Sequence, residues 1–138
     1  MKIFLDSDVL IDFLTAREPF LYEIKVIINK GVNKEIDLFS SSLIIANIHY
    51  FISKLENSKQ AINKITKLTK FIKILNVGES EILESLKSKF KDFEDSIQNS
   101  CATKAKMDII VTRNIKDFKH SLLPILTPKE FLKKLENE

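Results

Sequence analysis

The sequence of 138 residues has few of the residues that interrupt or cross-link a chain: one cysteine, two glycines, three prolines and no tryptophan. The single thiol, Cys101, cannot form an internal disulfide, which argues against a small secreted domain held together by disulfides. The scarcity of glycine and proline predicts mostly regular structure with short loops. Neither a glycine-rich phosphate-binding loop nor a cysteine–histidine metal motif is present, so chemistry that depends on them is not expected.

Long hydrophobic runs are also missing from the sequence. No apolar stretch approaches the roughly 20 residues that a helix needs to cross a bilayer, and the N-terminal apolar run is too short for the core of a secretion signal. With 44% hydrophobic and 30% charged residues, the composition fits one globular domain over residues 1–138. We therefore expect a cytoplasmic protein without a membrane partner. The net charge of +3 permits an anionic partner but does not require one.

Short apolar runs alternate with amphipathic segments along the whole chain. Strands are expected at residues 2–6, 35–41, 73–77, 107–113 and 122–127, with helical spacing in the segments between and after them. This alternation predicts βα units, and hence an α/β fold with a parallel sheet flanked by helices in three layers. Ser7 or Asp8 is expected to cap the first helix, Pro19 to lie in the first turn of the second helix, and Gly31 to end it.

Three acidic residues stand among apolar ones in the first segment, MKIFLDSDVLIDFL. An unpaired buried charge is costly or shifts its pKa until it is neutral, so these carboxylates need solvent or a positive partner. Asp6 ends the first predicted strand, and ligand sites in parallel sheets lie at the carboxyl ends of strands. Asp6 is therefore expected to face a cleft. Asp8 is expected to cap the helix, and Asp12 to reach solvent or to pair with a cation.

Further polar residues occupy comparable positions in the C-terminal half. The segment KDFEDSIQNSCATKAK places Asp92 and Asp95 at the start of a predicted helix, three residues apart and able to share a face. The strand DIIVT is followed by RNIKDF, which puts Asn114 and Asp117 just beyond its carboxyl end. Oxygen ligands gathered at one edge of a sheet suit Mg²⁺ or Mn²⁺, and such an ion would let the carboxylates stay ionised together.

The segments FLDSDVLIDFL, DFEDSIQNSCATKAKMDIIVTRNIKDF and ILTPKEFL resemble PIN domains, especially the VapC-like toxins of bacteria and archaea. The resemblance covers residues 2–132. It implies a metal-dependent endoribonuclease that acts on RNA with Mg²⁺ or Mn²⁺, pairs with an antitoxin protein and forms a homodimer. By position it implies Asp6, Asp95 and Asp117 as catalytic residues, and the same three with Asn114 as metal ligands.

The resemblance also implies supporting residues, and one of them departs from the family pattern. Asn47 stands where the family usually has a glutamate, in the helix after the second strand; an amide can bind a metal but brings no charge. Ser7 and Asp92 are expected to bind substrate or to support the metal ligands. Arg113 is expected to contact phosphate or to pair with one of the acids.

Two other functions remain open from the sequence alone. The segment LDSDVLID offers the Asp-x-Asp pair of haloacid-dehalogenase-like phosphatases, in which the first aspartate is a nucleophile, although Val9 and Leu10 stand where glycine and threonine are expected. A degenerate PIN domain that binds RNA or protein without cutting is the other alternative, and Asn47 is the residue that favours it. Cleavage of single-stranded RNA and release of phosphate from a small ester distinguish the three.

Overall fold

The five strands of the computed structural model, which describes residues 1–138, form one parallel sheet. They are β1 (Lys2–Leu5), β2 (Asp37–Ser41), β3 (Ile72–Leu75), β4 (Ile109–Val111) and β5 (Ile125–Leu126). The order across the sheet is β3-β2-β1-β4-β5, and every neighbouring pair is parallel. The strands are short and mostly buried, which fits a parallel sheet covered on both faces.

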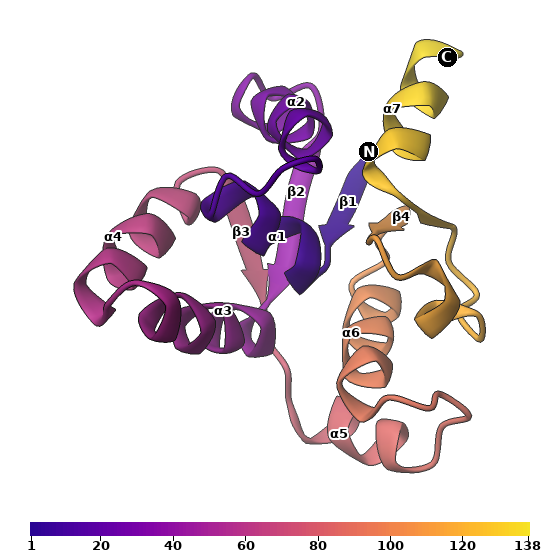
Figure 1. Cartoon of the computed structure of the whole chain (residues 1–138). Helices are drawn as coiled ribbons and strands as arrows, with labels where there is room; N and C mark the ends of the chain where they lie inside the picture. Colours follow the sequence, from indigo (N-terminus) through magenta and orange to yellow (C-terminus); the bar gives the residue numbers. More distant parts are fainter.

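Six α-helices and one 3-10 turn connect these strands, and a seventh helix follows the last strand. The helices are α1 (Ser7–Leu14), α2 (Leu21–Val32), α3 (Ser42–Leu55), α4 (Ser58–Leu68), α5 (Glu79–Leu86), α6 (Phe93–Lys104) and α7 (Pro128–Glu136), and the turn is η1 (Ile115–Phe118). The α3–α4 and α5–α6 pairs lie on opposite sides of the strands (Figure 1). The α/β fold predicted from the sequence, with a parallel sheet between helices, is therefore confirmed.

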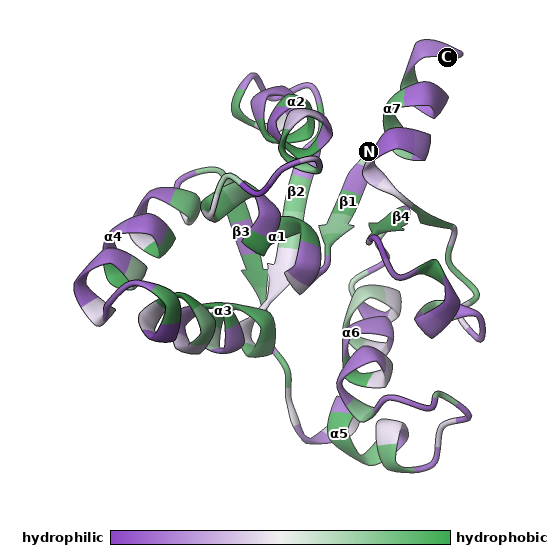
Figure 2. Cartoon of the chain, in the orientation of Figure 1, coloured by the Kyte–Doolittle hydropathy of each residue, from purple (hydrophilic) through white to green (hydrophobic).

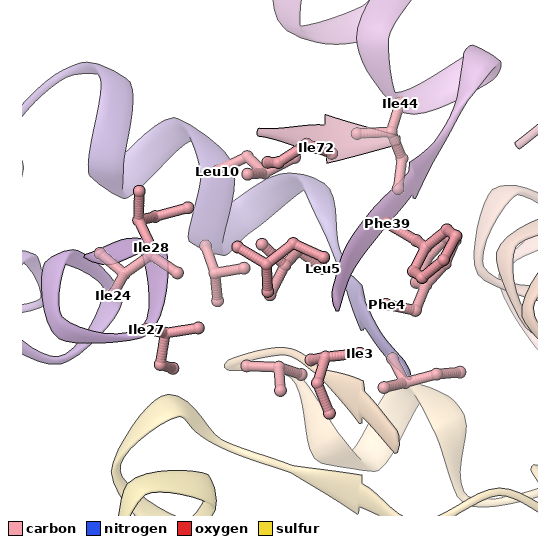
Figure 3. Packing of buried hydrophobic residues seen from close by; sticks show 14 of the residues in the cluster. Ile3, Phe4, Leu5, Leu10, Ile24, Ile27, Ile28, Phe39, Ile44 and Ile72 are labelled. Carbon is pink, nitrogen blue, oxygen red and sulfur yellow. The ribbon is translucent and has the colours of Figure 1, made fainter. Parts of the chain in front are cut away.

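Apolar side chains fill the space between the sheet and the helices in a cluster of 24 buried residues. Leu5 of β1, Leu10 of α1 and Ile28 of α2 gather on one side of the strands, and Phe39 lies on the other (Figure 3). The strands are correspondingly hydrophobic, whereas α7 is largely hydrophilic along its length (Figure 2). This continuous core fixes the carboxyl ends of the strands relative to one another.

The direction of strand addition reverses beside β1, and this reversal positions the site. The chain first adds β2 and β3 on one side of β1, then returns through α5 and α6 to add β4 on its other side. In open parallel sheets a crevice forms where the order reverses, outside the carboxyl ends of the two strands. Here those strands are β1, which ends before Asp6, and β4, which ends before Thr112.

Three local predictions about helix ends were wrong. Asp6, not Ser7 or Asp8, caps α1, because its carboxylate accepts a hydrogen bond from the backbone N–H of Ser7. Pro19 precedes α2 without entering its first turn. Gly31 does not end α2 but lies inside its last turn, where an added Cβ would stand 2.3 Å from Cδ1 of Leu38. That glycine thus permits close approach of α2 to β2.

None of the helices is long and apolar enough to cross a membrane.

Candidate metal centre at the carboxyl edge of the sheet

Asp6 is the central residue of the site and is 4% exposed. Its Oδ1 accepts a hydrogen bond from the backbone N–H of Ser7 at 2.8 Å, and its Oδ2 accepts one from the hydroxyl of Thr112 at 2.9 Å. The first contact caps α1 and the second connects the end of β1 to the end of β4. Asp6 is therefore held in one orientation at the crevice between these strands.

Thr112 is a site residue that the sequence interpretation missed. It is fully buried, and its Oγ1 lies 2.9 Å from Asp6 Oδ2 and 3.3 Å from Asp8 Oδ2. Its Oγ1 also accepts a hydrogen bond from the backbone N–H of Asn114 at 3.1 Å. Thr112 thus orients the first two acids and shapes the turn that carries Asn114. The sequence signal that could have identified it is its position directly after an apolar strand, as Asp6 stands directly after β1.

Asp8 accepts the hydrogen bond that fastens α1 to the turn after β4. Its Oδ2 accepts from the backbone N–H of Arg113 at 3.0 Å, whereas its Oδ1 is buried and has no hydrogen-bond partner. A buried carboxylate oxygen without a partner is uncommon in folded proteins, because its desolvation is uncompensated. Burial raises the pKa of Asp8 above its usual value. The expected role as helix cap belongs to Asp6 instead.

Asp12 forms a buried ion pair with Arg113. Arg113 donates from Nε to Asp12 Oδ2 at 2.7 Å and from Nη2 to Asp12 Oδ1 at 3.3 Å. Asp12 is 1% exposed, and the guanidinium carbon lies 4.0 Å from the centre of the Phe20 ring. The paired geometry satisfies both carboxylate oxygens. Asp12 thus has the positive partner that its position required, and Arg113 serves to pair an acid.

Asp95 approaches the site from the opposite layer, at the start of α6. Asp92 caps this helix by accepting a hydrogen bond from the backbone N–H of Asp95 at 2.9 Å. One turn further along α6, buried Gln98 accepts a hydrogen bond from the hydroxyl of Ser41 at the end of β2. That contact connects α6 to the same edge of the sheet and so supports the position of Asp95.

Several carboxylates lie near one another at this edge, and both burial and their charges raise the pKa values of Asp6 and Asp95. Burial, followed by the charges of Asp8 and Asp117, raises the pKa of Asp6 from 3.8 to about 7. Burial, followed by the charges of Asp6, Asp92, Asp117 and Asp8, raises the pKa of Asp95 from 3.8 to about 7. The structure therefore brings Asp6, Asp95 and Asp117 within electrostatic range of one another.

The donor set suits a hard divalent cation. Asp6, Asp95 and Asp117 form no ion pair, because the nearby guanidinium of Arg113 pairs with Asp12. Asp8 keeps a buried oxygen without a hydrogen-bond partner. No group of three or more His, Cys, Asp or Glu side chains is close enough to hold one ion directly. Mg²⁺ in proteins commonly keeps several waters and uses only one or two carboxylates, so the arrangement fits an ion of this kind.

Four further residues were predicted to belong to the site. Asp117 lies on η1 and Asn114 immediately before it, both exposed. Asn47 is half-buried on α3. Ser7 contributes its backbone N–H to Asp6. Which of these side chains contact an ion or a substrate stays a prediction.

Comparisons with known proteins identify a matching family and a curated relative. A model of the PIN domain matches residues 2–116. Ribonuclease VapC1 of Aquifex aeolicus (strain VF5) is 29% identical over 136 residues, which cover 94% of this chain and 92% of that protein.

Solved structures share the fold at low sequence identity. The structure of VapBC-1 from nontypeable Haemophilus influenzae has a TM-score of 0.69 at 20% identity and covers 94% of this chain and 99% of that chain. DNA-bound VapBC from Salmonella typhimurium has a TM-score of 0.70 at 14% identity, with 93% and 98% covered. FitAcB from Neisseria gonorrhoeae has a TM-score of 0.69 at 15% identity, with 92% and 98% covered.

Proposed function

The chain belongs to the PIN domain family, and from this premise we propose that it is a metal-dependent endoribonuclease, the toxin of a toxin–antitoxin pair. The observation that carries the proposal is the crowding of Asp6, Asp95 and Asp117 at the crevice between β1 and β4. Repulsion there is relieved when a Mg²⁺ or Mn²⁺ ion is bound. The similarity to Ribonuclease VapC1 supports RNA as the substrate.

Each residue has a distinct task in this proposal. Asp6, Asp95, Asp117 and Asn114 would hold the ion, one or two of the carboxylates directly and the other side chains through the waters that such an ion keeps. A bound ion supplies an activated water and neutralises charge on the phosphate. Thr112 holds Asp6 in position, and the Asp92 cap holds the first turn of α6 beneath Asp95. These contacts prearrange the acids, so little reorganisation is needed when the ion and the RNA bind.

An antitoxin is the proposed protein partner. Two similar structures support this: a toxin–antitoxin complex from Klebsiella pneumoniae, and VapBC2 from Rickettsia felis bound to a DNA fragment from its promoter. They match this chain at 19% and 20% identity, with TM-scores of 0.65 and 0.67. We infer that a second protein covers the site of this chain when it is inactive, and that the chain pairs with another copy of itself, as the family resemblance implies.

The experiment that tests the proposed function is cleavage of labelled single-stranded RNA by the purified chain. We expect fragments with Mg²⁺ or Mn²⁺ and none with EDTA. Phosphate release from a small ester, measured in parallel, would instead support the phosphatase. RNA binding by the folded protein without cleavage under any divalent ion would support the degenerate PIN domain and reject the nuclease.

Asn47 provides a separate prediction about the strength of metal binding. If it lies beside the ion in the place of the usual glutamate, Asn47→Glu adds one negative charge to the site. Binding of Mn²⁺ should then tighten by on the order of 1–2 kcal/mol, the size of one close charge–charge interaction at an effective dielectric well above that of dry protein. Calorimetric titration of Mn²⁺ into both proteins measures the difference.

The matched control for this prediction is Asn29→Glu, because Asn29 is exposed near the end of α2. That helix leads into β2, so the control adds the same charge toward the opposite edge of the sheet. Equal Mn²⁺ affinity in the wild-type protein and a folded Asn47→Glu variant would place Asn47 outside the metal site.

A further inference from the structure

A basic hollow adjoins the acidic site on the side of η1. Its volume is about 420 Å³, and six polar or charged residues line it: Lys91, Asp92, Lys116, Asp117, Lys119 and His120. Two of these, Asp92 and Asp117, are also among the charges that raise the pKa of Asp95. Asp117 is also a proposed ligand of the ion, and Asp92 caps the helix that carries Asp95, so the hollow shares these two acids with the candidate metal centre.

The lysines of this hollow are arranged by the local backbone. Lys116 lies in η1 and Lys119 caps its C-terminal end, three residues later. Because a 3-10 helix has three residues per turn, side chains at this spacing lie on one face, one above the other. Lys91 comes from the loop before α6 and lines the same hollow. The two segments thus present three ammonium groups around one space.

Aromatic packing holds the two segments together. The ring of Phe90, next to Lys91, meets the ring of Phe118 edge-on at 6.1 Å between centroids and lies 6.0 Å from the ring of His120. Phe118 is 1% exposed, which anchors η1 in the core. The walls of the hollow are consequently held by aromatic contacts that do not involve the lysines, so the ammonium groups are free to bind.

None of these lysines is used in an ion pair. The salt bridges of the protein involve Lys30, Lys64, Lys104, Lys134 and Arg113, and none lies in the hollow. Three unpaired cations at one place attract a polyanion, and a single-stranded nucleic acid presents phosphates in succession. Resting on the proposed function, we infer that this hollow binds the backbone phosphates of RNA beside the phosphate that is cut. Lys91, Lys116 and Lys119 are its positioning residues.

The test is binding of a fluorescent single-stranded RNA of mixed sequence, measured by anisotropy in EDTA so that no divalent ion supports cleavage. The variant replaces Lys91, Lys116 and Lys119 together by glutamine. We expect Kd to rise at least about tenfold, and the slope of log Kd against log salt to fall by about 2, because each lost phosphate contact on a single strand accounts for about 0.7.

The matched control replaces Lys34, Lys70 and Lys106 by glutamine. These three exposed lysines lie in the turns that lead into β2, β3 and β4, at the opposite edge of the sheet. The control removes the same net charge, so its Kd should change by less than about threefold. Circular dichroism and melting of both variants verify that they are folded.

The outcomes separate this inference from the proposed function. Wild-type protein that binds RNA, with equal affinity in the hollow variant and the control, overturns the hollow as the phosphate site and leaves the nuclease standing. Wild-type protein that neither binds nor cleaves RNA rejects the proposed function, and this inference with it.

Discussion

Asp6→Asn and Asp95→Asn should each lower the rate of metal-dependent RNA cleavage by at least about a hundredfold, while the protein stays folded. Both acids are proposed ligands of the ion that activates water and neutralises charge on the phosphate. An amide in place of either carboxylate removes one charge from the site and weakens the hold on that ion. Initial rates at one fixed Mn²⁺ concentration, the same for the variants and for wild type, measure the effect.

The contacts around Asp6 explain why this substitution should be tolerated. The amide oxygen of an asparagine can still accept from the N–H of Ser7, and its NH₂ can donate to the hydroxyl oxygen of Thr112. The substitution also relieves repulsion, so the melting temperature without metal should not fall. Asp37→Asn is the matched control, since Asp37 is exposed at the start of β2, at the opposite edge. Undiminished cleavage by a folded Asp6→Asn or Asp95→Asn variant would refute the assignment.

Arg113→Met should lower the free energy of unfolding by about 3 kcal/mol, because it removes the partner of a buried carboxylate. Asp12 is 1% exposed and accepts both of its ion-pair hydrogen bonds from Arg113. The variant also loses the contact of the guanidinium with Phe20. Denaturant unfolding without divalent ions measures this loss without interference from metal binding.

A second substitution distinguishes loss of the ion pair from general damage. Adding Asp12→Asn to Arg113→Met removes the uncompensated charge, so the double variant should recover part of the lost stability. Arg113→Lys should fall between wild type and Arg113→Met, because an ammonium group cannot make the paired contact. A double variant no more stable than Arg113→Met would contradict the view that the buried charge of Asp12 causes the loss.

The sequence predicted the fold well because its signals were local and consistent. Apolar runs such as those of β1 and β4 alternate with amphipathic segments, and Thr127 with Glu130 forms the capping box of α7. The wrong predictions concerned helix ends, where contacts between distant parts of the chain determine the local structure. Gly31 was predicted to end α2, but a glycine is needed there because Leu38 of β2 approaches too closely for a side chain.

The candidate site was predictable in outline from the positions of acids after strands and at helix starts. Its internal contacts were not, because hydrogen bonds between residues about 100 positions apart leave no periodic signal. The contact of Thr112 with Asp6 and the pairing of Asp12 with Arg113 are of this kind. The functional role of Asp117 and Asn114 still rests on their position after β4 and on the family resemblance.

The most direct test of the central claim, that the crowded carboxylates form a divalent-cation site, is calorimetric titration of Mn²⁺ into the wild-type chain and Asp6→Asn. Asp6 and Asp95, whose pKa values are raised to about 7, must lose their protons to bind metal. Affinity should therefore rise from pH 5 to about pH 8 and level off above that, with protons released into the buffer when the titration is run at or below pH 7. Wild-type protein should bind Mn²⁺ at least about tenfold more tightly than Asp6→Asn. Equal affinity in the two proteins, or no binding to wild type at millimolar Mn²⁺, would contradict the account.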